Sequence, residues 1–75
     1  MAAPLSVVGI DPRRLYWNLP AVAAHVGVAK ETFLADCEAG RVRIRVERFG
    51  ERRLPMVHSR DTLAYLAFIG KGLQE

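Results

Sequence analysis

The chain has 75 residues, of which 51% are hydrophobic and 25% are charged, and its formal net charge is +3. This length allows one domain near the lower limit for a self-supporting core, and the composition excludes a disordered chain. The single cysteine excludes an intramolecular disulfide, and no apolar run reaches the roughly 20 residues of a membrane span. The start of the chain also lacks a secretory signal. We therefore expect a small soluble protein of a reducing cytoplasm.

Positive charge is concentrated in one segment of the chain. Residues 41–60 contain seven arginines against Glu47 and Glu51, a balance of +5, whereas the segments before and after it each carry a balance of −1. Concentrated positive charge of this kind favours a nucleic-acid partner.

The N-terminal stretch, residues 1–15, is short and apolar, and Gly9 and Pro12 interrupt it. We expect it to be an arm that either adds a strand or lies across the core. The rest of the chain predicts one domain over residues 16–70 and a tail over residues 71–75.

The stretch LYWNLPAVAAHVG predicts a first helix. Asn18 can cap its N-terminus, Pro20 removes no hydrogen bond in the first turn, and Gly27 ends it. Apolar residues at three- and four-residue spacing give the helix one core-facing stripe. This stripe consists of Leu19, Val22, Ala23 and Val26.

A second helix is predicted over residues 30–39, after a break of three residues, with Gly40 as its stop. Phe33 and Cys37 lie four residues apart and should face the first helix together with Val28. Two short helices joined by a tight glycine turn make a helix-turn-helix unit.

The stretch RVRIRVERFGERR, residues 41–53, holds six of the eleven basic residues and alternates charged with apolar side chains. Alternation predicts a half-buried strand, because successive side chains of a strand point to opposite faces. The inward residues are expected to be Val42, Ile44 and Val46. The outward residues are expected to be Arg41, Arg43 and Arg45.

The residues after this strand predict a hairpin. FGER supplies a turn, and RLPMV forms a returning strand with Leu54 and Met56 on its inner face. Pro55 has no N–H group to donate to a neighbouring strand, so we expect the returning strand at the edge of the sheet.

A third helix should follow the hairpin. Ser59 is its expected cap, Asp61 is favourably placed at its positive end, and it should end near the glycines of GKG. The helix is apolar on more than one side. One stripe consists of Leu63, Leu66 and Ala67, and the nearly opposite stripe of Tyr65, Phe68 and Ile69.

A helix that is apolar all round is buried or has a partner, which leaves two interpretations of the second stripe. In the first, the N-terminal stretch covers it within one chain, with Leu5, Val7, Val8 and Ile10. In the second, Tyr65, Phe68 and Ile69 form a self-association surface.

The order of elements predicts a fold that is mostly α with a small β-hairpin, a winged helix-turn-helix. WNLPAVAAHVGVAKETFLADCEAGRV resembles the helix-turn-helix of excisionase-like and MerR-like winged-helix proteins, including phage Cox-type regulators. It shares their capping residue (Asn18), an alanine four residues before the turn glycine (Ala23 before Gly27), GV followed by ET, and a closing EAGR. VHSRDTLAYL resembles the stretch that follows the wing. The chain departs from the pattern at Ala21 and Ala29.

The resemblance, which covers residues 16–66, implies a DNA-binding protein without catalytic activity. The second helix would enter the major groove and the hairpin would touch an adjacent minor groove or the backbone. The expected role is that of an excisionase or a transcriptional regulator in a phage or mobile element, located at the nucleoid of a bacterial host. Expected partners are double-stranded DNA, further copies bound to the same DNA, and an integrase, with no membrane and no cofactor.

The candidate DNA-binding residues lie on the second helix and the hairpin. On the helix they are Lys30, Glu31 and Thr32; on the hairpin they are Arg41, Arg43, Arg45, Arg48, Arg52 and Arg53. The helix is acidic apart from its one lysine, so the hairpin should supply most of the affinity, because arginine binds phosphate bidentately and enters narrow minor grooves.

Other interpretations stay open from the sequence. The arginines can be a solvated face that protects an edge strand from aggregation. The chain can instead be a small terminase-like DNA-packaging subunit, or a protein-binding winged-helix module such as an antirepressor or inhibitor. Cys37, His25 and His58 lack the spacing of a metal site, and Cys37 fits a core position. No catalytic motif is found, so we expect no enzyme.

Overall fold

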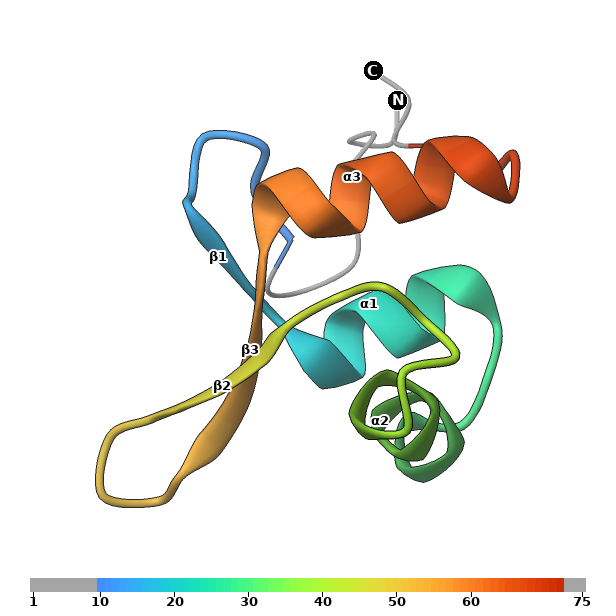
Figure 1. The fold of residues 1–75 in the computed structure, drawn as a ribbon. Coiled ribbons are helices and arrows are strands. Elements are labelled where there is room, and N and C mark those ends of the chain that lie inside the picture. The colour runs from blue at the N-terminus through green and yellow to red at the C-terminus, as the bar shows by residue number, and fades with distance from the viewer. Residues whose placement is uncertain (1–9, 73–75) are drawn as a thin grey trace.

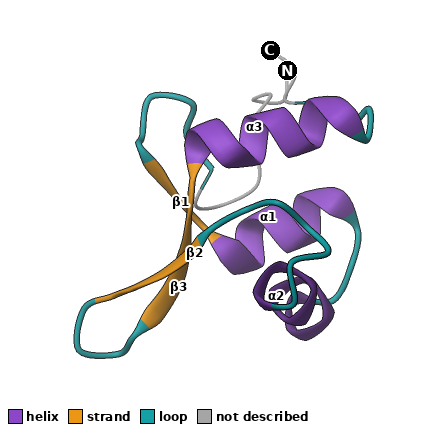
Figure 2. Ribbon diagram, viewed as in Figure 1, coloured by secondary structure: helices purple, strands orange, loops and turns teal. Residues whose placement is uncertain are grey.

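The computed structural model describes residues 10–72 and contains three helices and a three-stranded antiparallel sheet (Figure 1). The elements in chain order are β1 (Tyr16–Asn18), α1 (Leu19–Val26), α2 (Lys30–Glu38), β2 (Val46–Phe49), β3 (Leu54–His58) and α3 (Ser59–Phe68). The helices lie on one side of the sheet, with α1 between α2 and α3 (Figure 2). Within the described residues, no helix is long and apolar enough to cross a membrane.

The predicted helix–turn–helix is confirmed as a pair of helices with a short break. Gly27 ends α1 with a φ of 96°, and its N–H donates to the Ala23 carbonyl at 2.8 Å. Phe33 and Cys37 of α2 are buried, as predicted. Two details differ: Asn18 stands at the N-cap of α1 without a side-chain hydrogen bond, and Val28 is 41% exposed and lies outside the core.

The core lies between the sheet and the helices and is centred on Trp17. This side chain is fully buried, and its indole N–H donates to the Asp11 carbonyl at 2.8 Å. The predicted inner stripe of α1 is confirmed, because Leu19, Val22 and Ala23 are buried and Val26 packs against them. The rest of the core consists of Ile10, Ala21, Phe33, Cys37, Val42, Ile44, Val57 and Leu66.

The predicted long basic strand is wrong in its extent. Val42 and Ile44 are buried, as the alternation predicts, but residues 41–45 pair with no strand of the described chain, and β2 begins only at Val46. This segment follows α2 and runs past α1 to the sheet (Figure 1). Arg41, Arg43 and Arg45 therefore lie on a connecting segment and not on a face of the hairpin.

The returning strand is central and not at the edge, since the strand order is β1–β3–β2. Pro55 pairs with Arg48 on β2, and β1 ends at Asn18 opposite Met56, so the ladder on the β1 side stops before the proline. The inner residue of β3 is Val57, which is fully buried, whereas Leu54 is 48% exposed. The prediction that Leu54 and Met56 point inward is therefore wrong.

The cap of α3 is His58 and not Ser59. The Nδ1 atom of His58 accepts a hydrogen bond from the Arg60 backbone N–H at 3.1 Å. The hydroxyl of Thr62 donates to the His58 carbonyl at 2.8 Å, which satisfies a polar side chain that is fully buried. This one residue therefore closes the start of the helix through both its ring and its carbonyl.

The two predicted stripes of α3 are also corrected. Thr62 and Leu66 are buried, and Tyr65 and Ile69 pack against the core. The exposed residues of α3 are Arg60, Leu63, Ala64, Ala67 and Phe68. Ile10 is buried, while Leu5, Val7 and Val8 lie outside the described residues, so their proposed contact with α3 stays a prediction.

We predict that His58→Ala lowers the free energy of unfolding by about 1 kcal/mol, the usual contribution of a helix N-cap. His58→Asp removes the same ring but keeps an acceptor, so it should unfold at a higher urea concentration than His58→Ala. Ser59→Ala should stay within about 0.5 kcal/mol of the unsubstituted protein. A larger loss for Ser59→Ala than for His58→Ala would contradict this assignment of the cap.

Candidate nucleic-acid interface

The arginines of the basic segment fall into three locations. Arg41 and Arg43 line a cleft beside α3, Arg45 lies by the outer face of the sheet, and Arg48, Arg52 and Arg53 belong to the β2–β3 hairpin. The structure therefore brings only some of the six predicted arginines close to one another. The separation arises because residues 41–45 run along the helices before the hairpin begins.

Two of these arginines are paired with acidic side chains of α2. The Arg41 Nε donates to an Asp36 carboxylate oxygen at 2.8 Å, and the Arg48 guanidinium lies 3.3 Å from the Glu38 carboxylate. Each partially exposed pair is worth only about 0.2–1 kcal/mol. The pairs matter more for the charge of α2 than for stability, because they neutralise two of its three acidic side chains.

The remaining hairpin arginines are at its tip, residues 50–53. Arg52 and Arg53 are exposed, and their guanidinium groups have no ion pair with any residue from 10 to 72. Arg48 reinforces the turn, since its Nη1 donates to the Arg53 carbonyl at 3.3 Å. The tip therefore carries two exposed arginines that make no ion pair with the described residues, together with the exposed Glu51.

Arg53 has a backbone conformation that is unusual for its residue type. Its φ is 55°, and it is the one non-glycine residue with positive φ in the described part of the chain. This left-handed conformation costs a side-chain-bearing residue roughly 1–2 kcal/mol. The hairpin carries an arginine where glycine would be easier to accommodate.

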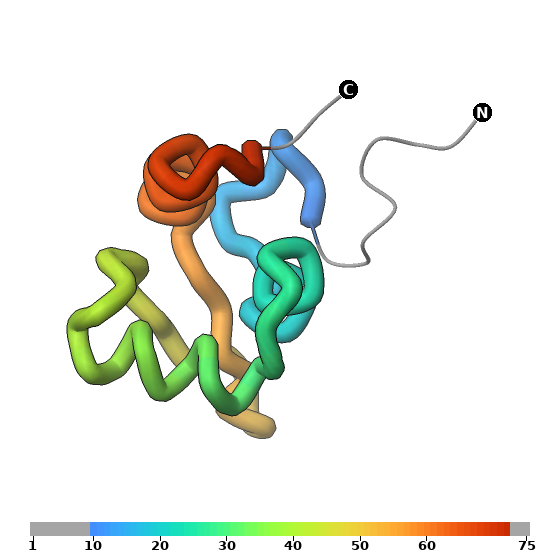
Figure 3. The backbone as a smooth tube through the Cα atoms, turned by 90° about the vertical axis from the view of Figure 1, so that its right-hand side faces the viewer, coloured from blue at the N-terminus to red at the C-terminus, as the bar shows by residue number. Residues whose placement is uncertain are grey.

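The residues of α2 predicted to read DNA lie on its free surface. Lys30, Glu31 and Thr32 are exposed in the first turn, and none of them makes a side-chain hydrogen bond to residues 10–72. In Figures 1 and 3, α2 and the hairpin tip lie at one end of the molecule and α3 lies at the other. We call the surface formed by α2 and residues 50–53 the α2–hairpin end.

Sequence reasoning missed a polar and aromatic cluster on the outer face of the sheet. The Tyr16 hydroxyl donates to the Glu47 carboxylate at 3.1 Å. The centroid of the Tyr16 ring lies 4.8 Å from the ring centroid of Phe49 and 5.1 Å from that of His58. Desolvation, followed by the hydrogen bond to Glu47, raises the pKa of the Tyr16 phenol. The rings meet edge-on, so the cluster links β1 to β2 and β3.

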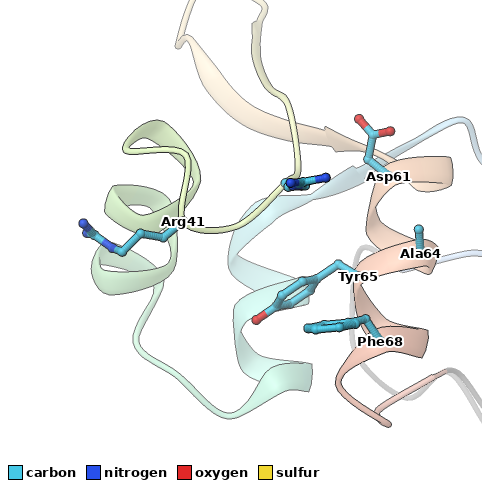
Figure 4. A pocket seen from close by; sticks show the side chains of 6 residues that line it. Arg41, Asp61, Ala64, Tyr65 and Phe68 are labelled. Atoms are coloured by element: carbon cyan, nitrogen blue, oxygen red, sulfur yellow. The ribbon is translucent and has the colours of Figure 1, made fainter.

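The α3 cleft has a volume of about 480 Å³. Figure 4 shows Tyr65 and Phe68 projecting from α3 toward the same side, while Arg41 extends away past α2. Of the three residues predicted for self-association, Tyr65 and Ile69 are held against the core and only Phe68, at 87% exposure, is free. The cleft is lined by Arg41, Arg43, Asp61, Ala64, Tyr65 and Phe68.

The cysteine and the histidines have structural roles. Burial, reinforced by the neighbouring carboxylates of Asp36 and Glu38, raises the pKa of the Cys37 thiol to about 11. A His25 ring nitrogen is hydrogen-bonded to the Lys71 carbonyl at 2.9 Å, and His58 caps α3. Within residues 10–72, no group of three His, Cys, Asp or Glu side chains is placed to hold a metal ion.

No protein-family model matches the chain, and no curated protein or solved structure matches it either.

We predict that Arg53→Gly stabilises the protein by up to about 1 kcal/mol, because relief of the left-handed strain exceeds the extra entropy of glycine in the unfolded chain. The matched control is Arg52→Gly, which removes the same charge at a neighbouring position without positive φ and should not stabilise. Urea unfolding of both variants measures the difference. A lower stability of Arg53→Gly than of Arg52→Gly would show that the strain argument is wrong.

Proposed function

We propose that this chain is a double-stranded DNA-binding protein with the winged helix-turn-helix architecture. In this proposal α2 enters the major groove and the β2–β3 hairpin is the wing, which contacts phosphates or the adjacent minor groove. The observation that carries it is the position of the tip arginines Arg52 and Arg53, which make no ion pair with the described residues, at the same end of the molecule as the exposed first turn of α2.

The ion pairs of α2 support this arrangement. An unpaired acidic helix would be repelled by the phosphate backbone, which carries one negative charge per roughly 1.7 Å of duplex. Arg41 and Arg48 compensate Asp36 and Glu38, so Glu31 is the remaining acidic side chain of α2. The Arg48–Glu38 pair also links the wing to α2.

The chemistry of the exposed residues assigns different tasks to the two elements. Arg52 and Arg53 provide sequence-independent affinity through bidentate contacts to phosphate. Lys30 can contact phosphate at the start of α2, Thr32 can contact a base or phosphate, and Glu31 can accept from a cytosine amino group. Base reading by α2 is limited to this first turn, since Ala35, the next exposed position of the helix, has no polar group.

The strain at Arg53 supports a functional role for the tip. A residue in a costly conformation is retained where its side chain is needed, and such outliers concentrate at functional sites. A purely protective edge arginine has no such requirement, and β2 is protected equally well by any charged residue. The tip is therefore better explained by anion binding than by solubility alone.

The biological role that we propose is a non-enzymatic one, as an excisionase or a transcriptional regulator of a phage or mobile element, acting in the bacterial nucleoid together with an integrase where it directs excision. It is supported by the resemblance of residues 16–66 to excisionase-like and MerR-like proteins. Selection of bound sequences from random duplexes tests specificity. Complete absence of gel retardation at physiological salt would instead favour a protein-binding module.

We predict that Arg52→Ala combined with Arg53→Ala weakens binding to all duplex sequences similarly. The slope of log K against log salt should flatten by about one unit for each lost phosphate contact. The matched control is Arg13→Ala with Arg14→Ala, because these adjacent arginines lie near the other end of β3, where the Ser59 N–H meets the Leu15 carbonyl. An unchanged slope for the tip variant, or an equal change in the control, would contradict contact by the wing.

A further inference from the structure

A single arginine side chain connects the hairpin tip to α2. Arg48 lies on β2, opposite Pro55 of β3 and outside the turn itself. Its Nη1 donates to the Arg53 carbonyl at 3.3 Å, and its Nη2 donates to a Glu38 carboxylate oxygen at 3.3 Å. Both terminal nitrogens of the guanidinium are therefore used within the chain, one toward the tip and one toward the helix.

The contact toward the tip is made with the residue in the left-handed conformation. Arg53 has a φ of 55°. Its backbone N–H donates to the Gly50 carbonyl at 3.2 Å, and its own carbonyl accepts from Arg48. Both backbone polar groups of Arg53 are thus hydrogen-bonded, and the Arg48 guanidinium supplies one of the two bonds that hold this conformation.

The contact toward the helix is made with a carboxylate in an unfavourable position. Glu38 is the last residue of α2, and no basic side chain lies in the last turn of this helix. The negative end of a helix dipole repels a negative charge, and the positive charge of Arg48 offsets this repulsion. Alanine at position 38 is therefore not expected to weaken α2 itself, because alanine is the best helix former and removes the repelled charge.

We propose that Arg48 is a positioning residue and not a phosphate ligand. It holds the tip arginines relative to α2 through Glu38, so that both parts of the α2–hairpin end meet one duplex together. This inference rests on the proposed DNA-binding function and reverses the expectation that Arg48 itself contacts DNA. The Arg48 side chain is 35% exposed, against 65% for the ion-paired Arg41.

Positioning strengthens binding without adding a contact to DNA. Elements that are already held in their bound arrangement lose less conformational freedom on association. A partly exposed ion pair is weak, so the expected effect on the dissociation constant is about two- to five-fold.

The first experiment uses the sign of a charge change. Loss of a carboxylate that has no positioning role raises the net charge by one and strengthens binding to a polyanion. Glu38→Ala and the matched control Glu31→Ala make the same change at exposed positions of α2. In fluorescence anisotropy with a labelled duplex of mixed sequence at physiological salt, Glu38→Ala should bind about two- to five-fold more weakly than the unsubstituted protein. Glu31→Ala should bind more tightly.

The result for Glu38→Ala decides between the two roles, and circular dichroism checks that both variants keep their helices. Binding of Glu38→Ala at least as tight as that of the unsubstituted protein would overturn the inference and leave the DNA-binding proposal intact. Absence of binding by the unsubstituted protein would overturn both, so the two failures are distinguishable.

The second experiment separates positioning from phosphate contact by salt dependence. Each phosphate contact contributes about one unit to the slope of log K against log salt. Arg48→Gln should weaken binding about two- to five-fold with an unchanged slope, whereas Arg52→Ala should flatten the slope by about one unit. An unchanged affinity of Arg48→Gln, or a slope flattened as much as in Arg52→Ala, would overturn the inference.

Discussion

The structure depends on the pairing of β3 with both of its neighbours at Val57. This residue lies opposite Trp17 on β1 and Val46 on β2, and its side chain and that of Trp17 are completely buried. Because a shift by one residue would turn every side chain of a strand to the other face, burial of Trp17 and Val57 defines the register. Since α1 follows β1 directly and α3 follows β3 directly, this register also positions two of the helices.

Local signals predicted the helices well, whereas strand pairing required information from distant residues. Gly27 and Gly40 ended α1 and α2 close to the predicted positions, because a left-handed residue stops a helix without help from the rest of the fold. The inward orientation of Val42 and Ile44 followed from alternation, which needs only an extended backbone. β1 was missed because three residues carry too little periodicity. Pro55 was misleading because it lies just beyond the end of β1.

In the candidate site, too, local features were predictable from the sequence and contacts between distant residues were not. The sequence identified the arginines, but the partners of Arg41 and Arg48 lie on α2, and no local pattern reveals those ion pairs. The faces of α3 were misassigned because one of its two fully buried positions, Thr62, is a polar residue whose hydroxyl donates to the His58 carbonyl. A search for apolar periodicity cannot find a buried threonine. The predicted core-facing side of α3 therefore differed from the one in the structure.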